Sequence, residues 1–224
     1  KGIIANPNCS TIIMVMALKP IYDLAKIKRV IVSTYQAVSG AGKEGIDELD
    51  AQVREHSEGR EMTANILPSA SAEKHYPIAF NLIPQIDVFC DNLYTKEEMK
   101  MVNETKKIME DYEMRITATT IRVPVYRSHS ESVNIELEKE VDLGAMREAL
   151  AKFPGVTVQD DPSKQEYPMP LYTSEKDDVY VGRLRRDESC EKSYNIWVVG
   201  DQIRKGAALN TLQIAETMIK NGWI

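Results

Sequence analysis

A cysteine lies at the point where a polar segment becomes a helix. Residues 6–11, with the sequence Asn-Pro-Asn-Cys-Ser-Thr, lead directly into the apolar run 12–18. Asn8 is a good N-cap, so Cys9 is expected at the first helical position, where backbone N–H groups and the positive end of the helix dipole favour a thiolate. The alternative is a buried structural cysteine, but such a residue has no need of the Asn-Pro-Asn flank. The segment therefore predicts that Cys9 is a nucleophile.

A cysteine nucleophile needs a group that moves protons, and His129 is the candidate. The other two histidines, His56 at the polar end of an expected helix and His75 in a Lys-His-Tyr-Pro loop, are expected to face solvent. Arg122 precedes His129 by seven residues, so the two would face opposite sides of one straight strand. Pro124 and the polar turn after it must bend the chain if both residues serve one site. A lone histidine at the end of a strand is otherwise more often structural than catalytic.

Small and polar residues follow the strand that is expected over residues 27–36. The strand ends in Ser-Thr-Tyr-Gln, with Gln36 last, and the Gly-rich turn 39–42 comes next. Ser39 and Gly40 in this turn would let a ligand approach backbone N–H groups, although a plain strand-to-helix loop would have a similar composition. On its own, the turn does not separate these two interpretations.

A charged pair opens another expected helix. The capping box 95–98 begins an amphipathic helix, and its first turn holds Glu97 and Lys100 on one face. A surface ion pair is the ordinary interpretation of such a pair. The remaining cysteines lack the setting of a nucleophile, because Cys90 is expected to pack and Cys190 lies near two glutamates that would raise a thiol pKa.

The composition limits the class of protein. Hydrophobic residues make up 43% of the 224 residues, which suffices for one large or two small folded domains, and the net charge is −6 without a basic block. A small-molecule substrate is therefore a more natural partner than nucleic acid or an anionic membrane. Three cysteines without a CxxC pair argue against a disulfide framework or a zinc site and favour a reducing compartment, the cytoplasm. Because the chain opens at Lys1 with little lead-in, we expect it to be a piece of a larger protein.

Alternating and helical patterns give the expected elements. Helices are expected from Cys9 to a kink or break at Pro20, and then over residues 44–55, 95–110, 141–153 and 202–220. Strands are expected over residues 27–36, 78–86, 115–125, 132–137, 179–185 and 195–199. Residues 154–178 contain four prolines and are expected to form one long loop.

Several segments together resemble the aspartate-semialdehyde dehydrogenases. The resemblance extends over essentially the whole chain and rests on residues 6–11, 33–42, 94–100, 122–129, 181–185 and 205–208. It implies an α+β fold with a mixed, largely antiparallel sheet and helices packed on one face, as in the C-terminal domain of glyceraldehyde-phosphate-dehydrogenase-like enzymes. It also implies a catalytic and dimerisation domain over residues 1–200, and a C-terminal helix over 201–224 that packs on a nucleotide-binding domain. The Gly-rich fingerprint of that domain does not occur in this sequence.

The resemblance further implies an activity and a set of roles. The activity is NADP-dependent reductive dephosphorylation of aspartyl 4-phosphate to L-aspartate 4-semialdehyde through a cysteine thioester, in the biosynthesis of lysine, threonine, methionine and isoleucine. Catalysis falls to Cys9, His129 and Gln36, substrate binding to Arg122, Glu97, Lys100 and Asn8, and cofactor contacts to Ser39, Gly40 and Gln202, without a metal. Gln202 stands where Asn is expected in many relatives. A homodimer or tetramer is implied as well, with most of the NADP site in the nucleotide-binding domain.

Two kinds of alternative remain open. A glyceraldehyde-phosphate dehydrogenase or an N-acetylglutamyl-phosphate reductase would share the thioester chemistry, although the residues around Cys9 speak against both. The chain could instead be a dimerisation fragment without catalysis. We expect the 224 residues alone to fold and dimerise without turning over substrate. The choice between NADP and NAD, and between dimer and tetramer, does not follow from the sequence.

Overall fold

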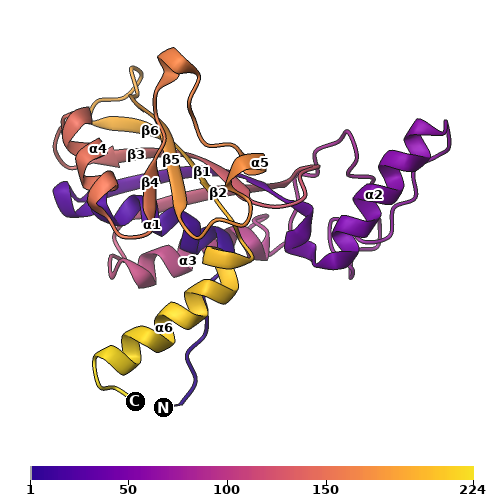
Figure 1. Ribbon diagram of the computed structural model, residues 1–224, viewed down its shortest axis with the longest axis horizontal. Helices are drawn as coiled ribbons and strands as arrows, with labels where there is room; N and C mark the ends of the chain where they lie inside the picture. Colours follow the sequence, from indigo (N-terminus) through magenta and orange to yellow (C-terminus); the bar gives the residue numbers. More distant parts are fainter. Residues whose placement is uncertain (1) are drawn as a thin grey trace.

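The computed structural model describes residues 2–224 as a mixed six-stranded sheet with helices packed against it (Figure 1). The strand order is β2-β1-β3-β6-β5-β4; β1 is parallel to β2 and β4 to β5, whereas the other three pairs are antiparallel. The strands are β1 (Ile27–Gln36), β2 (Arg115–Arg122), β3 (His129–Leu137), β4 (Val156–Val158), β5 (Val179–Arg186) and β6 (Ser193–Gly200). The expected α+β class, with a largely antiparallel sheet, is confirmed.

The main helices are α1 (Cys9–Leu24), α2 (Lys43–Ser57), α3 (Lys96–Ile108), α4 (Leu143–Lys152) and α6 (Leu209–Lys220). The main apolar core lies between α1, α3, α4 and one face of the sheet. Alternate strand residues point into it, for example Val30 and Val32 of β1 and Val133 and Ile135 of β3. The period-2 pattern of the sequence therefore fixes which face of each strand meets the helices.

Two expectations about prolines are wrong. Pro20 does not interrupt α1, since the helix continues to Leu24. Residues 154–178 are not one loop, because they contain β4 and the short helix α5 (Pro170–Thr173), in which Pro170 occupies the first helical turn. Proline at that position loses no helical hydrogen bond.

The strand expected over residues 78–86 is also absent from the described structure. Within this segment only Ile83 forms a bridge, which pairs it with Arg122. The side-chain oxygen of Gln52 accepts hydrogen bonds from the N–H groups of Ile78 and Ala79, at 2.8 and 3.0 Å. These two donors are therefore satisfied without a neighbouring strand.

The segment around α2 projects from the main body (Figure 1). It has a small apolar cluster of its own, formed by Val38, Leu49, Leu67, Ile78, Ala79 and Ile83. His56 lies in α2, and His75 lies in the segment between α2 and α3. His56 is exposed as expected, whereas His75 is half-buried and only partly fits the expectation.

The C-terminal segment differs from the single helix expected over residues 202–220. It begins with a π-helical turn, Arg204–Ala208, and α6 follows directly and runs away from the sheet (Figure 1). None of the residues of α6 is buried, and apolar side chains such as Leu212 and Ile219 are exposed. In the part of the chain that the structure describes, no helix combines the length and apolar character needed to cross a membrane.

Candidate active site

Three strands bring the expected site residues to one end of the sheet. Gln36 ends β1 and lies beside Arg122, which ends the parallel strand β2. His129 begins β3 on the other side of β1 and pairs with Gly200, the last residue of β6. Arg122 and His129 therefore belong to two strands that flank β1, and the chain between them passes over the end of β1. This crossing brings together two residues that one straight strand would hold on opposite faces.

Cys9 is the first residue of α1, as expected, and Asn8 is the N-cap. Asn8 Oδ1 accepts the N–H of Thr11 at 3.1 Å. The backbone N–H of Asn8 donates to Glu104 Oε2 at 2.7 Å. The N-terminus of α1 is thus fixed both by its own cap and by a carboxylate of α3.

The expected activation of Cys9 by the helix terminus is not what the structure shows. Burial, and after it the carboxylate of Glu97, raises the pKa of the Cys9 thiol to about 12. The hydrogen bonds from Ser10 and the charge of Arg122 act in the opposite direction, but they are the weaker influences. Desolvation of a thiolate outweighs one helix N-terminus here, so Cys9 is a protonated thiol in this structure.

Glu97 is a buried hub, not half of a surface ion pair. Glu97 is 6% exposed, and its Oε1 accepts hydrogen bonds from Asn8 Nδ2 at 2.8 Å and Gln36 Nε2 at 3.3 Å. Lys100 Nζ lies 3.5 Å from Oε2, with a side chain that is 45% exposed. Gln36 also donates to Ser10 Oγ at 2.7 Å. Glu97 therefore joins α1, β1 and α3, and Lys100 stands at the outer edge of the group.

Arg122 and His129 meet at Gly40. A Cβ on Gly40 would lie 2.6 Å from Arg122 Nη1 and 3.3 Å from His129 Cε1, so no other residue fits there without displacing one of them. Arg122 is 4% exposed, and its Nη1 donates to the carbonyl of Ala37 at 2.7 Å. The expected cofactor-side residue Gly40 is thus in contact with both expected site residues.

The hydrogen bond at Nδ1 determines which ring nitrogen of His129 carries the proton. The backbone N–H of Ala37 donates to Nδ1 at 3.0 Å, so the neutral ring is protonated at Nε2. Burial, with a smaller contribution from Arg122, holds the pKa of His129 well below its usual range. Within residues 2–224, Nε2 is buried without a hydrogen-bond partner. His129 is therefore a neutral donor whose buried N–H is left without an acceptor among these residues.

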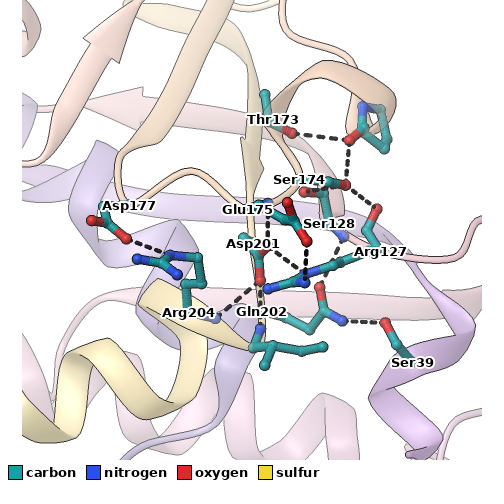
Figure 2. A network of polar contacts seen from close by, with 12 residues as sticks. Ser39, Arg127, Ser128, Thr173, Ser174, Glu175, Asp177, Asp201, Gln202 and Arg204 are labelled. Atoms are coloured by element: carbon teal, nitrogen blue, oxygen red, sulfur yellow. Dashed lines mark hydrogen bonds and ion pairs between the residues drawn. The ribbon is translucent and has the colours of Figure 1, made fainter. Parts of the chain in front are cut away.

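Ser39 and Gln202 are linked to each other on the same side of the site (Figure 2). Gln202 Nε2 donates to Ser39 Oγ, and Gln202 Oε1 accepts the backbone N–H of Ser128 at 2.9 Å. Both ends of the Gln202 amide are therefore engaged within the protein. This arrangement differs from the expected contact of Gln202 with a cofactor.

Two further residues at the site were not expected from the sequence. A Cβ on Gly206, in the π-helical turn, would lie 2.9 Å from Cys9 Cβ, so the glycine allows this turn to pack against Cys9. Glu104, which holds the N–H of Asn8, follows Glu97 by seven residues and so lies two turns along the same face of α3. The seven-residue spacing was a usable signal for Glu104, whereas nothing local indicated Gly206.

Comparison with known proteins identifies the family of this chain. The model of a family described as "Semialdehyde dehydrogenase, dimerisation domain" matches residues 18–205. The chain belongs to this family. The match covers α1 beyond its first turns, the whole sheet and part of the π-helical turn.

Individual relatives of this semialdehyde dehydrogenase dimerisation domain carry one name. The chain is 54% identical to aspartate-semialdehyde dehydrogenase of Aquifex aeolicus over 224 residues, which is 100% of this chain and 64% of that protein. It is 52% identical to the Bacillus subtilis protein of the same name, covering 98% of this chain and 64% of that protein. The chain thus spans less than two thirds of the length of these relatives.

Solved structures share the fold. Aspartate semialdehyde dehydrogenase II from Vibrio cholerae, in complex with ASA, superposes with a TM-score of 0.90 at 45% identity, covering 97% of this chain and 62% of that one. The Candida albicans enzyme with NADP has a TM-score of 0.71 at 23% identity, covering 99% and 58%. The semialdehyde dehydrogenase family therefore accounts for the sheet order and for the elements that converge on Cys9.

Proposed function

We propose that this chain is the catalytic and dimerisation part of an aspartate-semialdehyde dehydrogenase, which converts aspartyl 4-phosphate to L-aspartate 4-semialdehyde with NADPH. The observation that carries the proposal is the grouping of Cys9, Glu97, Arg122 and His129 at one sheet end, built from four separate elements. A thiol, an anion, a cation and a neutral N–H donor match a substrate with an acyl phosphate, an ammonium and a carboxylate. The relatives named above, about half identical to the chain, support the same assignment.

In the first step, Cys9 Sγ forms a bond to the acyl carbon of the substrate, and the bond from that carbon to the phosphate oxygen breaks. The thiol proton leaves with the phosphate, and a thioester remains on Cys9. Glu97 is the proposed partner of the substrate ammonium. Because the charge of Glu97 helps to raise the pKa of Cys9, neutralising it with the ammonium lowers that pKa when substrate binds. Substrate binding thus favours the reactive thiolate.

His129 is the proposed acid of the reaction. Its Nε2–H donates to the substrate oxygen that becomes negative when the acyl carbon turns tetrahedral, and it supplies the proton that this oxygen needs in the hemithioacetal. The N–H of Ala37 at Nδ1 supports the donor half of the expected acid/base role. A ring in this tautomer does not accept the thiol proton at Nε2.

The remaining polar groups hold the substrate. Arg122 is the proposed partner of the α-carboxylate, since a guanidinium offers two parallel donors where an ammonium offers one point charge. Lys100 is half-exposed and pairs with Glu97, which also binds Asn8, and this position suits Lys100 to the phosphate that enters and leaves from solvent. Gln36, bonded to both Ser10 and Glu97, orients the groups around Cys9.

The turn at Ser39 and Gly40 fits the nicotinamide of NADP. Gly40 is exposed and lies against the ring of His129, so a planar group resting on it would come next to the site without a side chain in the way. NADPH, when bound, supplies hydride to the acyl carbon. Gly40 keeps this approach open, and Ser39 is held by Gln202. Most of the cofactor would be held by a nucleotide-binding domain, on which α6 is proposed to pack.

A homodimer is the proposed assembly, in a soluble cytoplasmic enzyme of amino-acid biosynthesis. The helices α1, α3 and α4 cover one face of the sheet, while the other face presents the half-buried rings of Tyr35 and Trp197, tilted against each other with centroids 5.7 Å apart. Half-buried aromatic residues on a sheet face that no helix covers suit a two-fold contact with a second copy. The family description as a dimerisation domain agrees with this.

The substrate assignment is tested by comparing aldehydes. The protein that contains this chain, with any segment that precedes it, is assayed for phosphate- and NADP-dependent oxidation of aspartate semialdehyde, glyceraldehyde 3-phosphate and N-acetylglutamate semialdehyde. We expect kcat/KM to be highest for aspartate semialdehyde and to fall at least 100-fold in Cys9→Ser. Higher kcat/KM for either other aldehyde would overturn the assignment.

A further inference from the structure

We infer that the dipeptide Asp201-Gln202 is a clamp that positions His129 by holding the two residues before it, Arg127 and Ser128. This Asp201–Gln202 clamp rests on the proposed function only in that His129 is taken as the acid. It assigns to Gln202 a positioning role in place of a cofactor contact. Figure 2 shows how these side chains converge between the start of β3 and the end of β6.

Asp201 is the anchor of the clamp. It is fully buried, directly after the last residue of β6. Its Oδ1 accepts the N–H groups of Ile203 and Arg204 at 2.9 and 3.0 Å, and its Oδ2 accepts the N–H of Glu175 at 2.7 Å. The same Oδ2 forms an ion pair with Arg127 Nε at 2.6 Å. One buried carboxylate therefore fixes the start of the π-helical turn and the residue two positions before His129.

Gln202 holds the next residue. Ser128 is fully buried and has a φ of +71°, a left-handed conformation that side-chain-bearing residues rarely adopt. Its N–H donates to Gln202 Oε1 at 2.9 Å, and its Oγ lies 3.4 Å from Ser174 Oγ. Backbone strain of this kind persists when the surroundings fix it, and here the fixing contact comes from Gln202.

The direction of the His129 ring follows from this turn. His129 is the first residue of β3, so the backbone angles of Ser128 determine where its side chain leaves the sheet. On the other side of the ring, Ala37 holds Nδ1. The His129 ring is therefore fixed at two points. Ala37 fixes Nδ1, and the clamp fixes the backbone of Ser128, from which β3 begins. Loosening the clamp frees the ring to turn and to exchange its tautomer.

The inference is tested by NMR of the histidine rings in the 224-residue chain, in the absence of substrate and cofactor. The chain has only three histidines, and His56 in α2 and His75 in the segment after α2 serve as internal references. We expect His129 to show a proton on Nε2 alone at neutral pH. In Gln202→Met and in Asp201→Asn we expect this signal to be lost or averaged with the other tautomer, while His56 and His75 stay unchanged.

Matched variants separate positioning from stability. Asp160 also has a buried side chain, which pairs with Arg147 at 2.6 Å and accepts the backbone N–H of Arg183 at 2.7 Å. Asp160→Asn should lose a comparable ion pair and leave the His129 signal as in the wild type. Gln165→Met, at an exposed glutamine, is the matched control for Gln202→Met.

In the active enzyme, Gln202→Met should lower kcat about 10- to 100-fold, as a misplaced catalytic group does, with KM for NADP changed less than 2-fold. Three results would overturn the inference: a wild-type His129 signal in both clamp variants, an equal change in Asp160→Asn, or a loss confined to KM for NADP. Because the NMR experiment needs no turnover, a negative result there is distinct from failure of the proposed reaction.

Discussion

The backbone N–H of Ala37 and Nδ1 of His129 lie 3.0 Å apart in a hydrogen bond that leaves His129 with its proton on Nε2. Ala37 directly follows β1, and its carbonyl accepts the guanidinium of Arg122. One residue thus orients both the proposed acid and the proposed carboxylate ligand, through its N–H and its carbonyl. A histidine held in this way acts first as a donor, which fits a reaction in which negative charge develops on a carbonyl oxygen.

The first prediction concerns His129, which should affect both the pH dependence of stability and the value of kcat. Its folded pKa lies well below the usual value, so below about pH 6.5 the unfolded chain binds a proton that the folded chain does not. Stability therefore falls as the pH decreases from about 6.5, and His129→Asn should remove that part of the decline in urea titrations. In the enzyme, the same variant should lower kcat roughly 10²- to 10⁴-fold. Near-normal turnover of His129→Asn would make His129 structural.

The second prediction reverses what the sequence suggests about labelling. The setting of Cys9 at a helix start predicts that iodoacetamide modifies it before Cys90 and Cys190. With a pKa of about 12, only roughly 10⁻⁴ of Cys9 is ionised at about pH 8, whereas Cys190 is exposed. Peptide mapping after brief labelling should therefore find Cys190 modified first, and Glu97→Gln should speed the labelling of Cys9. If Cys9 is the first cysteine labelled in the wild-type chain, the prediction of an activated thiolate is correct and the raised pKa is wrong.

The third prediction compares two glutamates on β3 that face opposite sides of the sheet. Glu131 is fully buried, burial raises its pKa well above the usual value, and among residues 2–224 its carboxylate oxygens have no hydrogen-bond partner. The folded chain therefore keeps a proton that the unfolded chain loses above about pH 4.3, so this residue lowers stability as the pH rises. Glu131→Gln should gain stability relative to the wild type between about pH 5 and pH 8, by about 1.4 kcal/mol for each unit of pKa difference.

Glu136 is the matched control, because hydrogen bonding to Lys28 lowers its pKa. Its ionised form is favoured in the folded chain, so Glu136→Gln should lose stability above about pH 4.5 and gain none. Denaturant titrations of each variant at about pH 5 and at about pH 8 measure each effect. The same sign of change in the two variants would contradict the account of Glu131.

The fourth prediction concerns the proposed dimer. Trp197 lies on the sheet face away from α1, whereas Trp223, the other tryptophan, is 69% exposed beyond the end of α6. Trp197→Glu places a charge in the proposed contact and should convert the dimer to a monomer in sedimentation velocity. Trp223→Glu should leave the dimer intact. A dimer that survives Trp197→Glu with unchanged affinity excludes this face.

Local patterns in the sequence predicted most of the helices and strands. The β-branched residues of β1 and the Asn8 cap are features of the local sequence, and both were predicted at the correct residues. The failures depend on distant contacts. Gln52 satisfies the backbone at Ile78, 26 residues away, and so removes the need for the strand that was expected there.

The same limit applies to the site. Gly206 against Cys9 and Gln202 against Ser128 are contacts across the fold, the second between residues 74 positions apart. No composition or spacing around either residue reveals such a partner. The pKa of Cys9 is a similar case, since the helix start was visible in the sequence but the burial and the nearby Glu97 were not.

The most direct test of the proposed chemistry is acylation of the 224-residue chain by aspartyl 4-phosphate without cofactor. The first step needs only Cys9 and the residues around it, so mass spectrometry should find an aspartyl group on the peptide that contains Cys9. The adduct should be absent from Cys9→Ser and reduced in Arg122→Lys. An unmodified Cys9, or equal modification of Cys90 and Cys190, would contradict the assignment of Cys9 as the nucleophile.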